Sequence, residues 1–196
     1  MLVRVLTVSI FLSIIGLLTA QRFFAMPPQM TVTVRDVQGE SAWSVGDEMN
    51  RGEIIATGEE YLRLRIGEVA DIWLARQTTL ELRRLFEDEL SVLLTRGRML
   101  VSHHGQIPLR VQTNHTSHAV LGDVVSFVNY DFLETIHVIP LSGSVQVFVE
   151  GTGEGLLTPL PLSIHETDPV SYGTLEVNLS AGDAAEFYRW AGVLTP

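Results

Sequence analysis

The sequence contains no cysteine and no lysine. Without cysteine, the chain cannot form a structural disulfide, a cysteine-ligated zinc site or a thiol nucleophile. All thirteen basic residues are arginines, and 23 acidic residues outnumber them, so the formal net charge is −10. Binding to nucleic acid or flat docking on an anionic lipid surface needs a positive surface. The charge therefore argues against nucleic acid as a partner, and its simplest consequence is solubility.

Sequence motifs of the common enzyme classes are also missing. There is no G-x-S-x-G nucleophile elbow, no P-loop and no dinucleotide-binding glycine motif. Carboxylate clusters such as Glu59-Glu60 fall at expected turns, where solvated charge is the ordinary role. The sequence therefore predicts a protein that is not an enzyme and binds no cofactor.

Six histidines remain as candidate metal ligands. His103 and His104 are adjacent, so their side chains would point to opposite faces of a strand. One of them could pair with His115 or His118, and these two could also reach one ion from a loop. No fixed strand geometry demands such a site. We therefore expect polar turn histidines and no metal.

One long uncharged run occupies residues 5–20. As a helix it reaches about 24 Å, and the residues that follow would extend it to the roughly 30 Å hydrocarbon core of a membrane. Pro27-Pro28 would end the helix, because proline lacks an amide N–H and disfavours helix in the residue before it. Residues 1–28 are thus predicted to be a transmembrane anchor with its proline stop. The alternative is a secretory signal that is cleaved after Ala20.

Arginine flanks the apolar run on both sides, with Arg4 before it and Arg22 after it. Segments rich in positive charge tend to stay in the cytoplasm, and here the two sides are nearly balanced. A short N-terminal apolar segment is the usual device for export, so we expect the body of the protein outside the cytoplasm. We expect a single-pass protein of the cytoplasmic membrane, or a secreted one if the segment is cleaved.

After the prolines, the sequence is punctuated by glycine and shows no long helical period. Alternation places Leu62, Leu64 and Ile66 on one face of a strand. Short strands about every ten residues, separated by turns, are typical of an all-β domain. The predicted strands are 29–37, 41–45, 53–57, 61–66, 69–74, 79–84, 90–95, 98–102, 109–113, 119–121, 124–130, 134–139, 144–150 and 174–179.

The predicted β domain covers residues 29–150, and residues 151–196 are predicted to form a loop and a C-terminal β extension. The first part of this extension is rich in glycine and proline, which indicates an exposed loop. Residues 181–190 fit either a final strand or a short helix, and we favour the strand. Tyr188 and Trp190 are candidates for a docking patch, because exposed aromatic residues often anchor interfaces.

A signature of turns runs through the β domain. Its glycines are expected to supply positive φ angles or close backbone approach, so their predicted role is structural. The signature residues are Gly46, Asp47, Gly52, Thr57, Gly58, Gly67, Gly97, Gly122 and Gly143.

The order of these turns and strands, over residues 31–149, resembles the FecR domain family of extracytoplasmic bacterial proteins. In that family a G-D turn precedes a G-[DE]-x-I-x-T-G element, and here Gly46-Asp47 precedes residues 52–58. A later family element, G-T-x-F, is altered, since Asp123 replaces its threonine. The other matching residues are Leu62, Leu64, Gly67, Ile72, Leu74, Leu80, Leu82, Gly97, Arg98, Val101, Pro108, Val111, Thr113, Gly122, Gly143 and Val145.

The resemblance implies an all-β module, a twisted β-solenoid or sandwich of short strands, that acts outside the cytoplasmic membrane without catalysis. Some members of the family relay a signal from the cell surface to a sigma factor through a cytoplasmic N-terminal domain. Here only Met1–Arg4 would precede the span. We therefore do not expect this chain to control a sigma factor directly.

The sequence thus predicts a membrane-anchored, extracytoplasmic FecR-like module with an envelope protein as its partner. Its expected function is protein–protein interaction or signal relay. The alternative is a bitopic β module that carries lipid or glycolipid across the envelope. That alternative requires an apolar groove that is open between the sheets.

Overall fold

The computed structural model describes residues 28–131, 133–149, 155–167, 170–178, 182 and 184–193. The predicted membrane anchor lies outside these ranges, apart from Pro28. No helix within the described ranges is long and apolar enough to cross a membrane.

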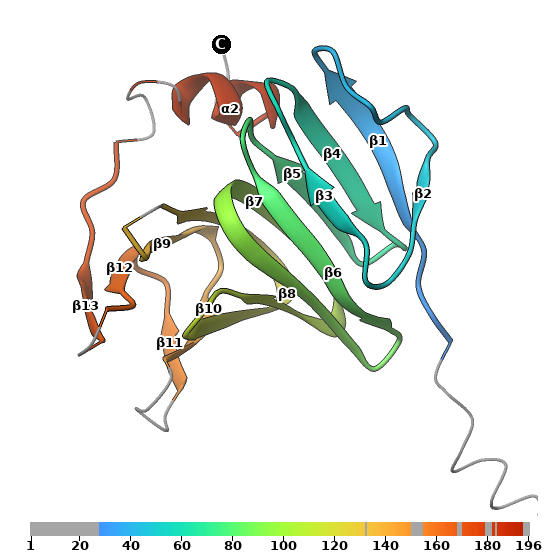
Figure 1. Cartoon of the computed structure of the whole chain (residues 1–196). Coiled ribbons are helices and arrows are strands. Elements are labelled where there is room, and N and C mark those ends of the chain that lie inside the picture. The colour runs from blue at the N-terminus through green and yellow to red at the C-terminus, as the bar shows by residue number, and fades with distance from the viewer. Residues whose placement is uncertain are drawn as a thin grey trace, which may run out of the picture.

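The described chain is built mainly from strands that form one antiparallel sheet (Figure 1). This confirms the all-β prediction in its general form. The strands are β1 (Val32–Gln38), β2 (Glu48–Met49), β3 (Ile54–Ala56), β4 (Tyr61–Ile66), β5 (Ala70–Leu74), β6 (Thr79–Phe86), β7 (Glu89–Gln112), β8 (Thr116–Tyr130), β9 (Thr135–Ser142), β10 (Val145–Val149), β11 (Gly155–Thr158), β12 (Leu162–His165) and β13 (Ser171–Thr174).

The sheet curls over on itself. Its main path runs β13-β12-β9-β8-β7-β5-β4-β1-β2, while β10 and β11 branch from β8, and β6 and β3 branch from β7. In Figure 1, β3, β6 and the first part of β7 lie in front of β4 and β5. The largest cluster of buried apolar side chains draws on both of these groups of strands. Each large aliphatic side chain buried there stabilises the fold by about 1.5–3 kcal/mol.

Strand β4 shows the alternation that its sequence predicts. Leu62, Leu64 and Ile66 are fully buried in the interior, whereas Arg63 and Arg65 lie half-buried on the outer face. Because the side-chain period of a strand is two, this register fixes which residues are presented outward from β4.

Strand β7 passes from one layer of the curled sheet to the other. Its first part pairs with β6, and its second part pairs with β5 and β8. Gly97, with a φ of 99°, lies where the pairing changes. The prediction of separate strands at 90–95 and 98–102 was therefore wrong. The predicted strands 98–102 and 109–113 are also joined, because β7 continues through a bulge that ends at Leu109.

Several other boundaries differ from the sequence prediction. Strand β8 joins the segments 119–121 and 124–130, and no strand forms at 41–45. Strand β11 lies in the predicted loop, and β12 was not predicted. The late strand predicted at 174–179 is instead β13, which ends at Thr174. Strands β11 and β12 owe their conformation to pairing with β10 and β9, and β13 pairs with β12. Local sequence patterns do not report such pairing.

The C-terminal segment forms a helix, α2 (Ala184–Trp190), where a strand was favoured. Its apolar residues Ala184, Phe187, Tyr188 and Ala191 follow the i, i+3, i+4, i+7 spacing of one helix face. Phe187 and Tyr188 are buried against the outer face of the sheet, in a second apolar cluster. Packing supplies most of the stability of so short a helix, because isolated helices of this length are marginal.

Candidate functional site

The signature residues mostly occupy turns with unusual backbone geometry. Gly58 is the signature glycine that has no positive φ angle. Its backbone N–H donates to Glu60 Oε2 at 2.8 Å. Asp47 Oδ2 accepts the backbone N–H of Ser44 at 2.8 Å. The signature glycines with positive φ angles are Gly46, Gly52, Gly67, Gly97, Gly122 and Gly143.

Thr57 and Thr78 form a buried hydrogen-bond network that joins three strand ends, and we call it the threonine network. Thr57 Oγ1 donates to the carbonyl oxygen of Ala75 at 2.6 Å and accepts the backbone N–H of Thr78 at 2.9 Å. Thr78 Oγ1 accepts the backbone N–H of Arg98 at 3.0 Å and donates to its carbonyl oxygen at 3.1 Å. A Cβ on Gly97 would lie 2.5 Å from Thr78 Oγ1, so only glycine fits.

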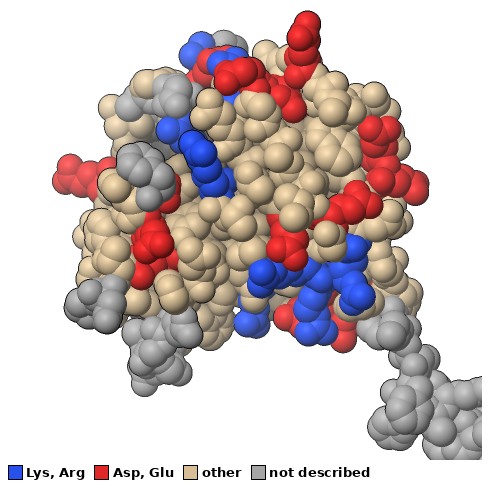
Figure 2. All heavy atoms as spheres, viewed as in Figure 1, with Lys and Arg blue, Asp and Glu red and all other residues tan. Residues whose placement is uncertain are grey.

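A cavity of about 490 Å³ lies beside the threonine network and extends to α2. Its wall carries Arg76 from the turn after β5, and Arg96 and Arg98 from either side of the bend in β7. Glu59 and Asp131 also reach its wall. We call it the arginine cavity. Figure 2 shows arginine side chains below α2 and over the bend of β7, beside a broad uncharged surface.

The three arginines of the cavity are compensated to different degrees. Arg76 contacts Glu186 Oε1 at 3.1 Å, and its guanidinium lies 4.7 Å from the centre of the Tyr61 ring. Arg98 Nε donates to Asn129 Oδ1 at 3.3 Å. The Arg96 side chain is exposed and has neither an acidic nor a hydrogen-bonding partner within the described residues. Arg96 is therefore the cation of this cavity most available to a ligand.

The two acids of the cavity are engaged by other groups. Asp131 Oδ1 accepts the backbone N–H groups of Leu133 at 2.8 Å and Thr135 at 3.2 Å. Glu59 Oε1 accepts from Gln77 Nε2 at 3.2 Å. These donors are neutral, so both carboxylates keep their charge, but neither forms an ion pair with Arg96 in the described structure.

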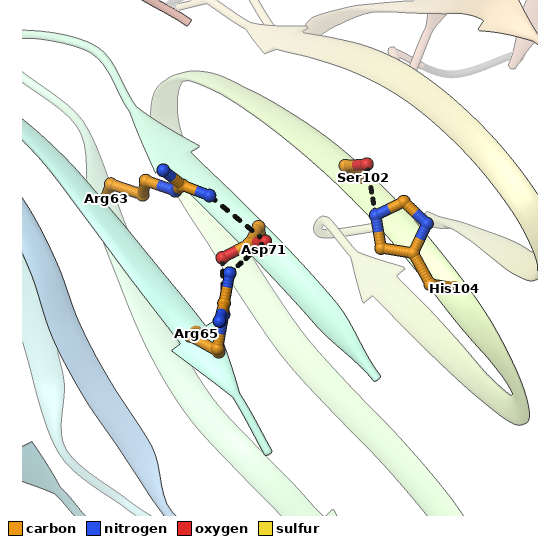
Figure 3. Close-up of polar contacts among 5 residues, drawn as sticks. All are labelled: Arg63, Arg65, Asp71, Ser102 and His104. Atoms are coloured by element: carbon orange, nitrogen blue, oxygen red, sulfur yellow. Dashed lines mark hydrogen bonds and ion pairs between the residues drawn. The ribbon is translucent and has the colours of Figure 1, made fainter. Parts of the chain in front are cut away.

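A second polar cluster lies on the outer face of β4, β5 and β7 (Figure 3). Arg65 Nε and Nη2 donate to the two oxygens of Asp71, each at 3.0 Å, and Arg63 Nη2 lies 3.3 Å from Asp71 Oδ2. Burial opposes ionisation of Asp71, but the hydrogen bonds from Arg65 and Arg63 outweigh it and hold its pKa below the usual value. A bidentate pair of this kind fixes β4 against β5.

Ser102 and His104 extend this cluster along β7, and no sequence motif points to Ser102. Ser102 Oγ lies 2.8 Å from His104 Nε2, and His104 Nδ1 lies 3.8 Å from Asp123 Oδ1. A serine–histidine–acid triad needs the acid hydrogen-bonded to the imidazole so that it holds the ring. Asp123 is 94% exposed and too far away for that bond. The adjoining hollow holds only about 100 Å³.

His103 and His118 are buried in β7 and β8, so the prediction of polar turn histidines was wrong for these two. His103 is fully buried, and its ring nitrogens lie 2.8 Å from the carbonyl oxygens of Gly122 and Ile107, so the ring spans the bulge of β7. His118 is buried, and desolvation lowers its pKa to about 4, which keeps it neutral. No group of three metal-ligating side chains occurs in the described part of the chain.

Tyr188 and Trp190, the proposed docking residues, pack against the sheet of their own chain. Tyr188 is 2% exposed and its ring centre lies 5.0 Å from that of Phe127. Burial raises the pKa of its hydroxyl. Trp190 is half-buried and stacks on Tyr61 at 5.2 Å. The exposure that a docking patch requires is therefore not found for Tyr188.

The space between the layers is filled by side chains. A small apolar hollow of about 160 Å³ lies at the edge formed by β10–β13, and its wall includes Leu156, Leu162 and Tyr172. Sites for small molecules commonly hold about 300–1,000 Å³. This hollow is smaller than the open apolar groove that a lipid carrier would need.

Comparison with known proteins gives a likeness at the level of the fold. Neither a protein-family model nor a curated protein matches the sequence. Two crystal structures described as candidate anti-sigma factors from Parabacteroides distasonis ATCC 8503, at 2.50 and 1.65 Å resolution, are similar. Both are 16% identical, with TM-scores of 0.53 and 0.54 over 62% and 71% of this chain. The chain spans 59% and 64% of their lengths.

Proposed function

We propose that this chain is a FecR-like module, anchored outside the cytoplasm, that binds another envelope protein and relays a signal without catalysis. The observation that carries the proposal is the likeness of its fold to structures described as candidate anti-sigma factors. The signature residues have a structural role that suits such a module, because Thr57 and Gly97 both contact Thr78 in the threonine network. The filled interior favours this function over lipid transport.

The location can be tested by protease protection of the full chain in membrane vesicles. We expect the β domain to be digested in right-side-out vesicles and protected in inverted ones. Extraction with alkaline carbonate should leave the chain in the membrane pellet if the N-terminal segment is an uncleaved anchor. Digestion from the cytoplasmic face would overturn the proposed location.

The relay can be tested through transcription in the host cell. Deleting the chain should change a defined set of transcripts, and the wild-type chain should restore them. A chain that only links envelope proteins mechanically would leave transcription unchanged. That result would reject signal relay and leave binding as the function.

A further inference from the structure

We propose that the arginine cavity receives a carboxylate-bearing segment of the protein partner. The inference rests on the proposed function and adds the chemistry by which the partner is recognised. It concerns a site that is separate from the cluster of Asp71 and His104 on the outer face of the sheet.

The first support is that arginines outnumber acids by three to two in the wall of one cavity of an acidic protein. The chain carries a net charge of −10, yet three of its thirteen arginines face one cavity. They come from two separate segments, the turn after β5 and the bend of β7. Arg96 has no acidic partner in the described structure. The planar guanidinium fork of arginine matches a carboxylate with two parallel hydrogen bonds, which suits this residue to such a ligand.

The second support is the rigidity of the cavity wall. Gly97 lies between Arg96 and Arg98, has a positive φ angle and is in close contact with Thr78. Gln77, next to Arg76, has a φ of 54°, which is rare for a residue other than glycine. Strained backbone held by buried hydrogen bonds is found most often at binding and active sites. The threonine network thus fixes the backbone that carries Arg96 and Arg98 before a ligand arrives.

The third support is the size and lining of the cavity, which fit a peptide segment. Its volume of about 490 Å³ is large enough for one or two side chains. Tyr61 and Phe187 form part of its wall, but they are only 3% and 1% exposed, so the arginines would provide the recognition. Long polyanions such as nucleic acid would meet the acidic remainder of the surface, so charge favours a local carboxylate.

Glu186 on α2 already supplies a carboxylate at the edge of this site. It contacts Arg76 at 3.1 Å, and both side chains are about half exposed. A partner carboxylate would compete with Glu186 for Arg76 while binding Arg96 without competition. This makes Arg96 the residue whose loss should weaken binding most.

The test uses the full chain in nanodiscs of uncharged lipid and follows the arginine Nε–H signals by NMR. The probes are a capped tetraglutamate peptide, the matched tetraglutamine peptide and inorganic phosphate. We expect tetraglutamate to shift the Arg96 signal and tetraglutamine to leave it unchanged. Arg96→Gln should weaken tetraglutamate binding at least about tenfold, because hydrogen bonds between charged groups contribute about 1.5–3 kcal/mol. Arg35→Gln, at an exposed arginine on β1, is the matched control.

Three outcomes would overturn the inference. They are equal binding of the two peptides, equal binding by the Arg96→Gln and Arg35→Gln variants, and phosphate binding as tight as that of tetraglutamate. In the host, Arg96→Gln should fail to restore the transcripts lost on deletion, whereas Arg35→Gln restores them. If Arg96→Gln restores them fully, the relay stands and the cavity is not the partner's site.

Discussion

Gly97 couples the bend of β7 to the arginine cavity. Its φ of 99° is strained for any residue with a Cβ, and such a Cβ would meet Thr78 within 2.5 Å. Gly46 has nearly the same φ, 97°, but nothing lies within 4 Å of a Cβ there. Alanine substitutions at the two positions can therefore be compared, since one adds backbone strain alone and the other adds strain and steric overlap.

We expect Gly97→Ala to lower the free energy of unfolding by about 2–4 kcal/mol, since strain and overlap add. Gly46→Ala should cost only about 1–2 kcal/mol, from strain alone. Denaturant unfolding of the full chain measures both values. Equal losses for the two variants would show that the contact with Thr78 can relax.

His118 makes the stability of the fold dependent on pH. Desolvation lowers its pKa from 6.5 to about 4, so the unfolded chain binds a proton at a higher pH than the folded chain. Acidification from pH 6.5 to 4 therefore lowers the free energy of unfolding, and the loss reaches about 3 kcal/mol at pH 4. The contribution of Asp71 is lost only at lower pH, because its pKa is held below the usual value.

His118→Leu should remove most of this dependence of the free energy of unfolding on pH. Its Nε2 has no hydrogen-bond partner, and its cross-strand neighbours are Val111 and Val147, so an apolar side chain suits the position. Denaturant unfolding at several pH values between 7 and 4 compares the variant with the wild type. A small slope should remain from His137, whose pKa burial also lowers. An unchanged slope would mean that His118 is not the responsible group.

Helix α2 depends on its contacts with the outer face of the sheet. Phe187 is 1% exposed and lies between Tyr61 and Tyr188, whereas Arg189 is exposed to solvent. Phe187→Ala should destabilise the protein by about 3–5 kcal/mol and loosen the helix. Arg189→Ala should change stability by less than about 0.5 kcal/mol. Thermal unfolding and hydrogen exchange of the helix amides test this, and equal effects would contradict it.

At the scale of single strands and helices, local sequence patterns predicted some elements and not others. The alternation of leucine and arginine was sufficient to predict β4, because the leucines face the buried interior. Gly97 and Gly105 resemble turn residues, and only pairing with β8 shows that β7 continues through both. The spacing of Phe187 and Tyr188 with the neighbouring alanines could have identified α2, but the strand rhythm that precedes it favoured another strand.

At the scale of the whole molecule, the arginine cavity could not have been predicted from sequence. Arg76 and Arg96 are separated by the hairpin of β6 and β7, and the pairing of Thr79 with Arg96 brings the two segments together. Phe187 joins them only because α2 folds back onto the sheet. A site of this kind depends on topology, and no local motif encodes it.

The continuity of the sheet has a consequence for the division of the chain near residue 150. Strand β12 pairs with β9, and its Leu162 and Ile164 are buried in the main interior. Removing it would expose the edge of β9 together with its apolar contacts, and exposed edges favour aggregation. Residues 29–150 should therefore not fold stably without the strands that follow.

Two truncations of the full chain test this. A chain that ends at residue 178 loses α2 but keeps β11–β13, whereas one that ends at residue 150 loses both. We expect the longer chain to stay folded with reduced stability and the shorter one to unfold or aggregate. Hydrogen exchange at the β9 amides gives the decisive measurement, because β12 covers them. Equal protection in both truncated chains would show that β12 is energetically dispensable and that residues 29–150 form an independent domain.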